Sequence, residues 1–241
     1  MNTSLASIFD SDYKALVLGA SGAIGSGFVQ VFQADPRCLH VQVVSRSGST
    51  GYGSRFDLLD PKSIEQQALM CRALGPYQVI VDATGALTIE GIGPEKSLAQ
   101  LDSGALMRNF EINAVGPVMA LRYFAPLLAS GPCIYAKLSA RVGSISDNQK
   151  GGWYGYRASK AALNMLLQTA AIELQRKNPQ LRVVALQPGT VKSALSKPFA
   201  GNVSHLLEPH DSVAGMLAAL KGLSPKSGAH FVDYRGEGIA W

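Results

Sequence analysis

Short apolar runs alternate along the chain with longer stretches in which apolar residues recur every three or four positions. The runs that predict strands are residues 15–18, 40–44, 54–58, 77–82, 133–138, 183–186 and 229–232. The longer stretches predict helices, among them 61–73, 105–128, 157–176 and 212–221. Strands that alternate with helices form parallel sheets covered by helices on both faces. We therefore expect a doubly wound α/β fold with a seven-stranded, mostly parallel sheet, in one domain that spans residues 1–241.

The composition fits one globular domain and narrows the range of partners. The chain has 241 residues, of which 47% are hydrophobic, enough for a sizeable core. Its formal net charge is +5, and the basic residues are scattered along the sequence. This pattern disfavours nucleic acid as a partner, whereas an anionic cofactor suits a modestly basic chain.

Cysteine usage and the apolar stretches bear on the location of the protein. Cys38, Cys71 and Cys133 are widely spaced and form no metal-binding or redox motif, which is typical of a reducing compartment. The first residues lack the basic and apolar segments of a signal peptide. The apolar stretch 114–129 is broken by prolines and an arginine, so it does not predict a membrane span. We expect a cytoplasmic protein with no metal site and no membrane contact.

A glycine-rich turn joins the first predicted strand to the first predicted helix. Strand, glycine-rich turn and helix in this order are the setting of a dinucleotide-binding loop in a Rossmann-type fold. Glycine lets the backbone approach a pyrophosphate, and the helix N-terminus offers free N–H groups and a positive dipole end. An ordinary βα turn is the alternative. The residues predicted to bind the cofactor here are Gly19, Ser21, Gly22, Ala23, Ile24 and Gly25.

The residues after the second predicted strand favour NADP(H) over NAD(H). A carboxylate about 20 residues past such a loop binds the ribose 2′-hydroxyl of NAD. This chain has Ser45-Arg46-Ser47 there, and no Asp or Glu between Asp35 and Asp57. A guanidinium flanked by hydroxyls suits a 2′-phosphate instead. We predict that Arg46 binds this phosphate; a solvated loop arginine is the alternative.

Tyr156 and Lys160 form a candidate catalytic pair. They lie at the start of a helical pattern, and positions four apart lie on one face of a helix. A cation beside a phenol stabilises the phenolate, which lowers the pKa of the tyrosine from about 10. Such a group can give or take a proton near neutral pH. The alternative interpretation, two neighbours on a surface helix, is common for an isolated pair of this kind.

Two polar residues upstream of this pair are candidates for the same site. Asn113 lies within a predicted apolar helix, where Asn is a poor helix former. Its ordinary explanation is exposure or a local backbone bond, and its functional explanation is a role at the site. Ser139 directly follows the predicted strand 133–138, so its hydroxyl borders the crevice beyond the carboxyl ends of the strands.

Taken together, these motifs resemble the single-domain short-chain dehydrogenase/reductase family across essentially the whole chain. They occur in the family's order: the glycine-rich loop, Asp57-Leu58, Ala83-Thr84-Gly85, Asn113, a serine after the fifth strand, Tyr156-x-x-x-Lys160 and Pro188-Gly189. The run around Tyr156 and the final Trp241 resemble the C-factor and sniffer-like carbonyl reductase subgroup. The resemblance implies a further set of cofactor-binding residues: Asp57, Leu58, Ala83, Thr84, Gly85, Lys160, Pro188, Gly189 and Val191.

The same resemblance implies a role for each catalytic residue. Tyr156 is the proton donor or acceptor at the substrate oxygen, and Lys160 holds the nicotinamide ribose. Ser139 hydrogen-bonds the substrate carbonyl, and Asn113 fixes a water in the proton relay. The helices predicted at 105–128 and 157–176 carry apolar residues on more than one face, and family members commonly pair through the equivalent helices. We therefore expect a homodimer or homotetramer.

The glycine-rich loop and the turn after the fourth predicted strand depart from the family's pattern. The loop has Leu18 in place of a threonine and Ala23 in place of its middle glycine. The asparagine of the family's Asn-Ala-Gly turn is replaced by Ala83 or Asp82.

The catalytic serine is a third departure. It usually lies three residues before the glycine equivalent to Gly143, and this chain has Ala140 at that position. Ser139 is one step earlier. A bulge would turn Ser139 toward the crevice, whereas a regular strand would face it away.

Two functions fit these observations. The first is an NADP-dependent oxidoreductase that reduces a ketone or aldehyde, or oxidises the alcohol, with Tyr156 as proton donor or acceptor. The second is a non-catalytic nucleotide-binding signalling or regulatory protein on the same fold. The intact Tyr156–Lys160 pair favours the enzyme, and Ala140 with Ala23 favours the alternative. The sequence does not identify the substrate, whose pocket is expected to be built from residues 86–102, 141–153 and 190–210.

Overall fold

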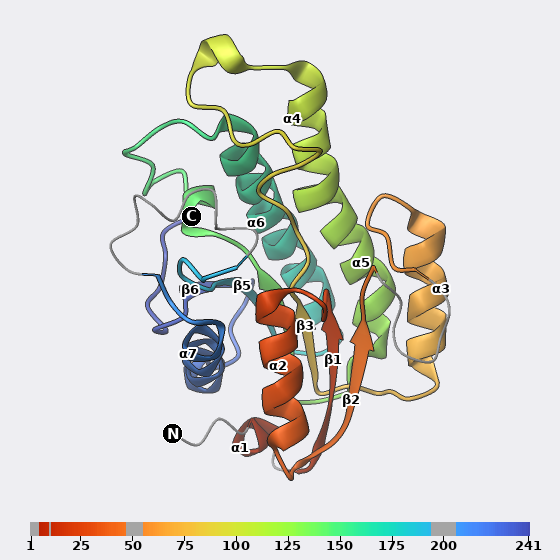
Figure 1. The fold of residues 1–241 in the computed structure, drawn as a ribbon. Helices are drawn as coiled ribbons and strands as arrows, with labels where there is room; N and C mark the ends of the chain where they lie inside the picture. Colours follow the sequence, from red (N-terminus) through yellow and green to blue (C-terminus); the bar gives the residue numbers. More distant parts are fainter. Residues whose placement is uncertain (1–4, 10, 47–54, 194–205) are drawn as a thin grey trace.

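A six-stranded parallel sheet forms the centre of the described part of the chain. The computed structural model describes residues 5–9, 11–46, 55–193 and 206–241. The strands are β1 (Tyr13–Leu18), β2 (Cys38–Val44), β3 (Val79–Asp82), β4 (Cys133–Leu138), β5 (Leu181–Gln187) and β6 (His230–Asp233). They lie in the order β2-β1-β3-β4-β5-β6, and every neighbouring pair is parallel (Figure 1). The predicted doubly wound α/β fold is confirmed.

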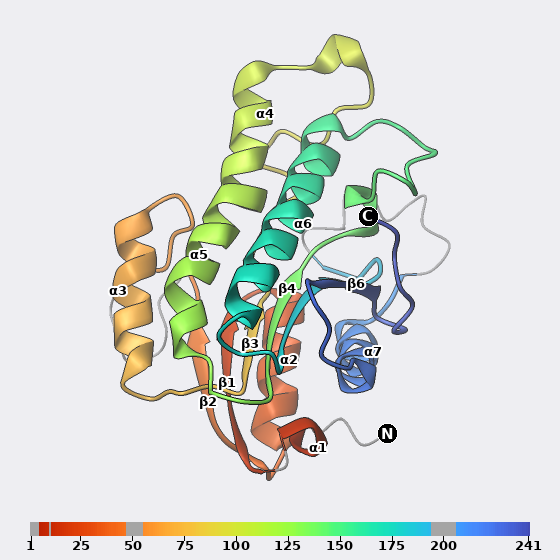
Figure 2. The same ribbon diagram turned by 180° about the vertical axis from the view of Figure 1, so that it is seen from behind.

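Helices cover both faces of the sheet. Their bounds are α1 (Ala6–Phe9), α2 (Ala23–Ala34), α3 (Pro61–Arg72), α4 (Ser103–Phe110), α5 (Gly116–Phe124), α6 (Tyr154–Gln175) and α7 (Pro209–Gly222). Helices α1, α2 and α7 cover one face (Figure 1), and α3, α5 and α6 cover the other (Figure 2). Short 3₁₀ turns occupy Leu98–Gln100, Ala125–Leu127 and Arg141–Gly143.

The alternation of side chains along each strand produces two cores, one on each face of the sheet. Within β1, Leu16 and Leu18 join the core under α3, α5 and α6, whereas Ala15 and Val17 join the core under α1, α2 and α7. Parallel strands buried on both faces read as continuous apolar runs, which is why the sequence pattern identified them. None of the described helices combines the length and apolarity that a membrane crossing requires.

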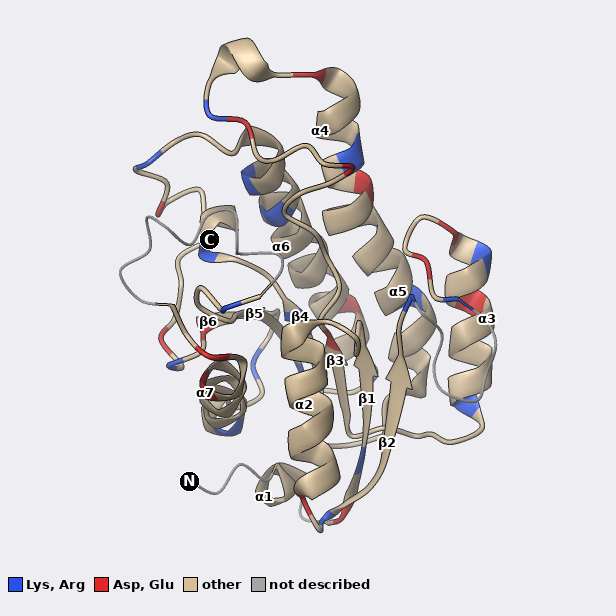
Figure 3. Ribbon diagram, viewed as in Figure 1, with Lys and Arg blue, Asp and Glu red and all other residues tan. Residues whose placement is uncertain are grey.

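The order of the strands places all their carboxyl ends at one edge of the sheet. The chain passes from β1 to β2 on one side, and β3 then pairs with β1 on the other side. Ligands of doubly wound sheets bind beyond the carboxyl ends at such a reversal point. Charged side chains are spread over many elements, with Lys and Arg interspersed among Asp and Glu (Figure 3).

The predicted third strand, at 54–58, is wrong for the residues that the structure describes there, 55–58. The Asp57 N–H donates to the side chain of Ser63 at 2.7 Å, and the Asp57 carboxylate accepts from the Leu59 N–H at 3.0 Å. Local bonds to the start of α3 therefore replace the bonds of a strand ladder. Phe56 is 1% exposed. This position is apolar because it is buried in a loop, and it does not belong to a strand. Among the described residues the sheet has six strands rather than the predicted seven.

The long helix predicted at 105–128 is present as a continuous helical segment, but it is not α-helical throughout. Helix α4 is followed by a π-helical turn at Glu111–Val115, and α5 begins only at Gly116. A π turn contains one residue more than an α turn, and it occurs frequently at functional sites. Asn113 lies within this turn, which rotates the helix surface at that position.

Candidate functional site

The glycine-rich turn after β1 is packed too closely for side chains at two positions. Gly19 has a φ of +78°, a conformation that favours glycine, and its N–H donates to Val44 O at 2.8 Å. A side-chain carbon at Gly25 would overlap Gly19 O, because the first turn of α2 lies directly on this loop. The turn therefore brings the N-terminus of α2 to the carboxyl edge of the sheet.

The N-terminal residues of α2 fit the pyrophosphate of a dinucleotide. Ser21 and Gly22 are exposed, and Ala23 and Ile24 are half-buried. The first N–H groups of a helix have no partner within the helix, and the helix dipole makes this end positive. The loop thus offers backbone donors and a positive field to an anion; the binding of a cofactor by these residues stays a prediction.

Arg46 lies two residues beyond the end of β2, beside this loop. Its side chain is exposed and Ser45 is buried, whereas Ser47 lies outside the described residues. The following segment lies close by, because the Phe56 N–H donates to Ser45 O at 3.4 Å. The half-buried Asp57 carboxylate there lies 3.8 Å from the Arg55 guanidinium. Leu58 packs against the start of α5, where a side-chain carbon at Gly116 would lie 2.7 Å from Leu58 Cβ.

A buried ion pair holds the Ala83-Thr84-Gly85 turn after β3. Lys137 Nζ lies 2.9 Å from Asp82 Oδ1, and both side chains are at most 1% exposed. The same ammonium donates to Thr84 O at 2.6 Å and to Thr84 Oγ1 at 2.9 Å. Lys137 lies within the predicted strand 133–138 and Asp82 stands out in the sequence only as a departure from the family's turn, so the sequence did not reveal this pair.

Asn113 clamps the residue that follows the turn. Its Oδ1 accepts from the Ala86 N–H at 2.9 Å, and its Nδ2 donates to Ala86 O at 2.8 Å. The side chain is fully buried. A side-chain carbon at Gly85 would lie 3.1 Å from Asn113 Oδ1 and 3.5 Å from Lys160 Nζ, so Gly85 separates these two residues. The structure thus brings the predicted Asn113, Gly85 and Lys160 together; the water-holding role of Asn113 stays a prediction.

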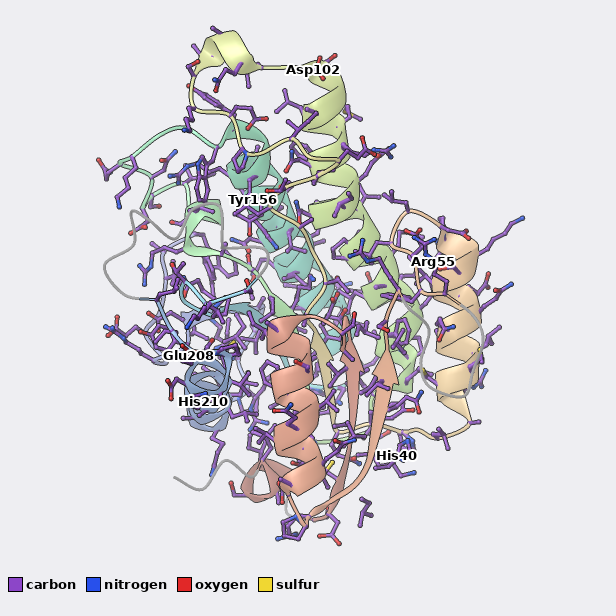
Figure 4. All side chains as sticks on the ribbon, in the orientation of Figure 1. His40, Arg55, Asp102, Tyr156, Glu208 and His210 are labelled. Atoms are coloured by element: carbon purple, nitrogen blue, oxygen red, sulfur yellow. The ribbon has the colours of Figure 1, made fainter. Side chains whose placement is uncertain are left out.

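Tyr156 and Lys160 lie in the first two turns of α6, and Tyr156 lies above the carboxyl ends of the strands (Figure 4). Lys160 Nζ is 5.6 Å from the centroid of the Tyr156 ring and donates to Leu138 O at 3.3 Å. The pKa of Lys160 is lowered to about 7, chiefly by burial; Lys137 contributes to the lowering and Asp82 opposes it. The predicted pairing of the two side chains on one helix face is therefore present.

The expected direction of the Tyr156 pKa is not what the structure gives. We expected the neighbouring cation to lower it, but burial raises the pKa of Tyr156 to about 12. The reason is that the phenolate loses solvation in this position, and the Lys160 ammonium suffers the same loss. In this state the tyrosine is a neutral proton donor at pH 7.

Ser139 lies under α6, with its hydroxyl donating to Asn164 Oδ1 at 2.6 Å. It is 4% exposed, and its backbone N–H continues the ladder by donating to Leu186 O. Orientation of a substrate carbonyl requires this hydroxyl to leave Asn164, so the role of Ser139 stays a prediction. Ala140 is half-buried with an extended backbone, and Ser144 is buried, with its Oγ accepting from the Asp147 N–H at 3.0 Å.

The start of α6 is held by a residue that the sequence analysis did not single out. Glu95 is 7% exposed, and its carboxylate accepts from the Gly155 N–H at 3.0 Å. Its backbone carbonyl accepts from Trp153, which has a left-handed φ of 54°. A carboxylate at a helix N-terminus satisfies a free N–H and complements the helix dipole. Glu95 therefore fixes the end of the helix that carries Tyr156.

The Pro188-Gly189 turn completes the edge after β5. Pro188 O accepts from Ser212 Oγ of α7 at 2.6 Å, and the Gly189 N–H donates to Gln187 Oε1 at 2.8 Å. Val191 is 4% exposed and pairs with Leu207. Apart from Lys160 on α6, the predicted cofactor-binding residues thus follow β1, β2, β3 and β5 at one edge, with Asp57 and Leu58 in the connection that leads to α3.

Similar known proteins identify the family to which the chain belongs. The chain matches the short chain dehydrogenase family over residues 13–203, and it belongs to that family. The C-signal protein of Myxococcus xanthus is 34% identical over 168 residues, which cover 69% of this chain and 94% of that protein. The 1-hydroxy-2-glutathionyl-2-methyl-3-butene dehydrogenase of Rhodococcus sp. (strain AD45) is 30% identical over 186 residues, which cover 77% and 78% of the two chains.

The fold is also that of solved carbonyl reductases. The structure of NADPH-bound carbonyl reductase from chicken fatty liver aligns with a TM-score of 0.80 and 23% identity, and covers 96% of this chain and 95% of that one. The resemblance inferred from the sequence motifs is therefore confirmed at the level of the family. The chain is a member of an oxidoreductase family with a Rossmann-type fold.

Proposed function

We propose that this protein is an NADPH-dependent oxidoreductase that reduces a ketone or an aldehyde. The observation that carries the proposal is the convergence of Tyr156, Lys160 and Asn113 at the carboxyl edge of the sheet, around Gly85. This edge also carries the glycine-rich turn and the N-terminus of α2. A positioned acid and a nucleotide-binding loop at one edge are the two parts that hydride-transfer chemistry needs.

The residues at this edge fit a nicotinamide dinucleotide. Gly25 leaves no room for a side chain at the loop, and the α2 N-terminus would hold the pyrophosphate. The exposed Arg46 would bind a 2′-phosphate, and Asp57 with Leu58 would border the adenine. Lys160 would hold the nicotinamide ribose. When bound, the cofactor supplies the hydride.

The chain's own contribution to the reaction is proton transfer at the substrate oxygen. The neutral Tyr156 phenol would donate its proton as negative charge develops on the carbonyl oxygen. Ser139, once released from Asn164, would donate a hydrogen bond to the same oxygen. The Lys160 ammonium, over the Tyr156 ring, would stabilise the phenolate that remains.

A non-catalytic signalling or regulatory function is the second candidate. The relative from Myxococcus xanthus bears the name C-signal, and the serine position of the family is Ala140 in this chain. The Ser139 hydroxyl donates to Asn164. Under this alternative, NADPH would bind without turnover.

An assay of NADPH oxidation against a panel of aldehydes, ketones and diketones tests the proposal. We expect oxidation with at least one substrate, and its loss in Tyr156→Phe. NADPH binding without turnover on the whole panel would favour the signalling function, and failure to bind NADPH would contradict both.

We further propose a cytoplasmic homodimer or homotetramer that acts on a small carbonyl or alcohol. The exposed apolar residues Met165 and Ile172 on α6, with Met107 on α4 and Val115 before α5, support self-association. Helices α4 and α5 follow each other end to end, and α6 lies beside them on the same side of the molecule (Figure 2).

A further inference from the structure

Lys137 and Asp82 form an ion pair in the interior of the protein, on neighbouring strands. They lie directly opposite each other in the register of β3 and β4, and neither is exposed to solvent. Removing two charges from water is costly unless good geometry and further hydrogen bonds compensate it. A buried pair at the carboxyl ends of these strands therefore needs a reason beyond the packing of the sheet.

All three protons of the Lys137 ammonium have acceptors in the segment from Asp82 to Thr84. They point to Asp82 Oδ1 at 2.9 Å, Thr84 O at 2.6 Å and Thr84 Oγ1 at 2.9 Å. Asp82 Oδ1 also accepts from the Thr84 N–H at 2.9 Å and from its hydroxyl at 2.5 Å. Lys137 on β4 thus holds the turn through its bonds to Thr84, and Asp82 holds it through its own bonds to the same residue.

The turn held in this way packs beside two candidate catalytic residues, Lys160 and Asn113. Thr84 leads directly to Gly85, where an added side-chain carbon would lie 3.5 Å from Lys160 Nζ and 3.1 Å from Asn113 Oδ1. Ala86, the next residue, is fixed by Asn113 through two hydrogen bonds. Movement of Thr84 would therefore be passed to Gly85 and to the space beside Lys160.

The pair also acts on Lys160 electrostatically. The charged groups that face Lys160 are Asp82 from β3 and Lys137 from β4, and Tyr156 lies beside it on α6. Lys137 lowers the pKa of Lys160 more than Asp82 raises it, which is consistent with the ammonium end of the pair being directed toward Lys160. Tyr135 lies behind the pair, with its hydroxyl donating to Asp82 Oδ2 at 3.4 Å.

We propose that Lys137 is a positioning residue of the hydride-transfer site, which holds the Thr84–Gly85 turn against Lys160 and Asn113. Its ammonium also opposes a second positive charge on Lys160. This inference rests on the proposed function and deepens it. The family's turn has an asparagine where this chain has Ala83 or Asp82, and in this chain Asp82 and Lys137 hold the turn.

The test compares Lys137→Met with the double variant Asp82→Asn/Lys137→Met. The single change leaves Asp82 buried without its counter-charge, and it is expected to lower the Tm strongly or to prevent folding. The double variant removes both charges, and the amide oxygen that replaces the carboxylate can still accept from the Thr84 N–H. Its Tm should therefore be close to that of the wild type. Tyr135→Phe is the matched control, because it removes a long hydrogen bond to Asp82 and leaves the ammonium bonds in place.

Two readouts on the double variant separate positioning from a merely structural role. The first is the titration midpoint of Lys160 in the protein without cofactor, obtained from the pH dependence of stability with and without Lys160→Met. It is expected near 7 in wild type and at least ~0.5 pH unit higher in the double variant. The second is NADPH affinity, expected to fall by about tenfold with a parallel fall in kcat/KM.

The proposal is supported if the Lys160 midpoint rises and the NADPH affinity falls in the folded double variant, while both stay at wild-type values in Tyr135→Phe. An unchanged midpoint or an unchanged NADPH affinity overturns it. A wild-type protein that binds NADPH but turns over no substrate contradicts the proposed function alone, because affinity and midpoint still decide the role of Lys137. If the wild type binds no NADPH, the midpoint alone decides whether Lys137 acts on Lys160.

Discussion

The Lys160 ammonium lies 5.6 Å from the centroid of the Tyr156 ring, one helical turn along α6. The spacing of four residues sets this relationship, because it brings the two side chains to one face of the helix. Burial favours the neutral form of both side chains, the phenol of Tyr156 and the amine of Lys160. The pKa of Tyr156 rises to about 12 and that of Lys160 falls to about 7.

The first prediction concerns the pH dependence of stability. With its pKa lowered from 10.5 to about 7, folded Lys160 loses its proton above pH 7, whereas the unfolded chain keeps it up to about pH 10.5. The unfolded state binds more protons in this window, so the Lys160 contribution to stability rises with pH from 7 to 10.5. Below pH 7 both states are protonated and the cost of burying the charge is complete.

Lys160→Met is therefore expected to stabilise the protein without cofactor by ~1–3 kcal/mol at pH 6.5, with the advantage shrinking by pH 9. Urea unfolding at the two pH values measures this difference. Lys150→Met, at an exposed lysine, is the control. An equal effect of Lys160→Met at both pH values would show that the Lys160 pKa is not lowered.

The second prediction concerns the serine that orients the carbonyl. Ser139→Ala should lower kcat by roughly 10²-fold or more, because it removes a donor to the developing alkoxide. Ser144→Ala, at a buried serine of the following turn, should leave kcat nearly unchanged. A Ser139→Ala variant that loses Tm but keeps its kcat would restrict Ser139 to tying β4 to Asn164 of α6.

The third prediction is a preference for NADPH over NADH. A charged hydrogen bond is worth roughly 1.5–3 kcal/mol, which corresponds to about ten- to a hundredfold in affinity. Arg46→Ala should lower kcat/KM for NADPH by that factor and leave the value for NADH nearly unchanged. Arg55→Ala, at the exposed arginine beside Asp57, is the control. Equal use of both cofactors by the wild type would remove the role of Arg46.

The fourth prediction concerns self-association. Met165 and Ile172 are 66% and 41% exposed on α6, two helical turns apart on one face. Changing both to Glu should convert a dimer or tetramer to monomers in light scattering at micromolar protein. Leu69→Glu, at a leucine 61% exposed on α3, should leave the mass unchanged. A monomeric wild type would contradict the proposed assembly.

Most of the fold could be predicted because parallel strands buried on both faces appear as apolar runs. The positions of Gly19, Pro188 and Gly85 at one edge followed from the ends of those runs. The strand predicted at 54–58 failed because Phe56 is buried in a loop, and burial alone does not distinguish a loop from a strand. The π turn around Asn113 was not predicted either, because a single inserted residue changes the spacing of apolar positions too little to be recognised in the sequence.

The ion pair of Lys137 and Asp82 could not be predicted from either residue alone. Each lies in an apolar run, and only the register of β3 against β4 shows that they face each other. The hydrogen bond from Ser139 to Asn164 depends in the same way on how α6 packs over β4. Glu95 was missed because its contact with Gly155 crosses 60 residues of chain.

The most direct test of the account is the rate of NADPH-dependent carbonyl reduction by Tyr156→Phe. The change removes the transferable proton and almost no volume, and general acid catalysis typically contributes 10²–10⁴-fold. The account predicts that turnover falls by at least a hundredfold while NADPH affinity stays within about threefold of the wild-type value. A variant that keeps more than about a tenth of the wild-type turnover would contradict the assignment of Tyr156 as the proton donor.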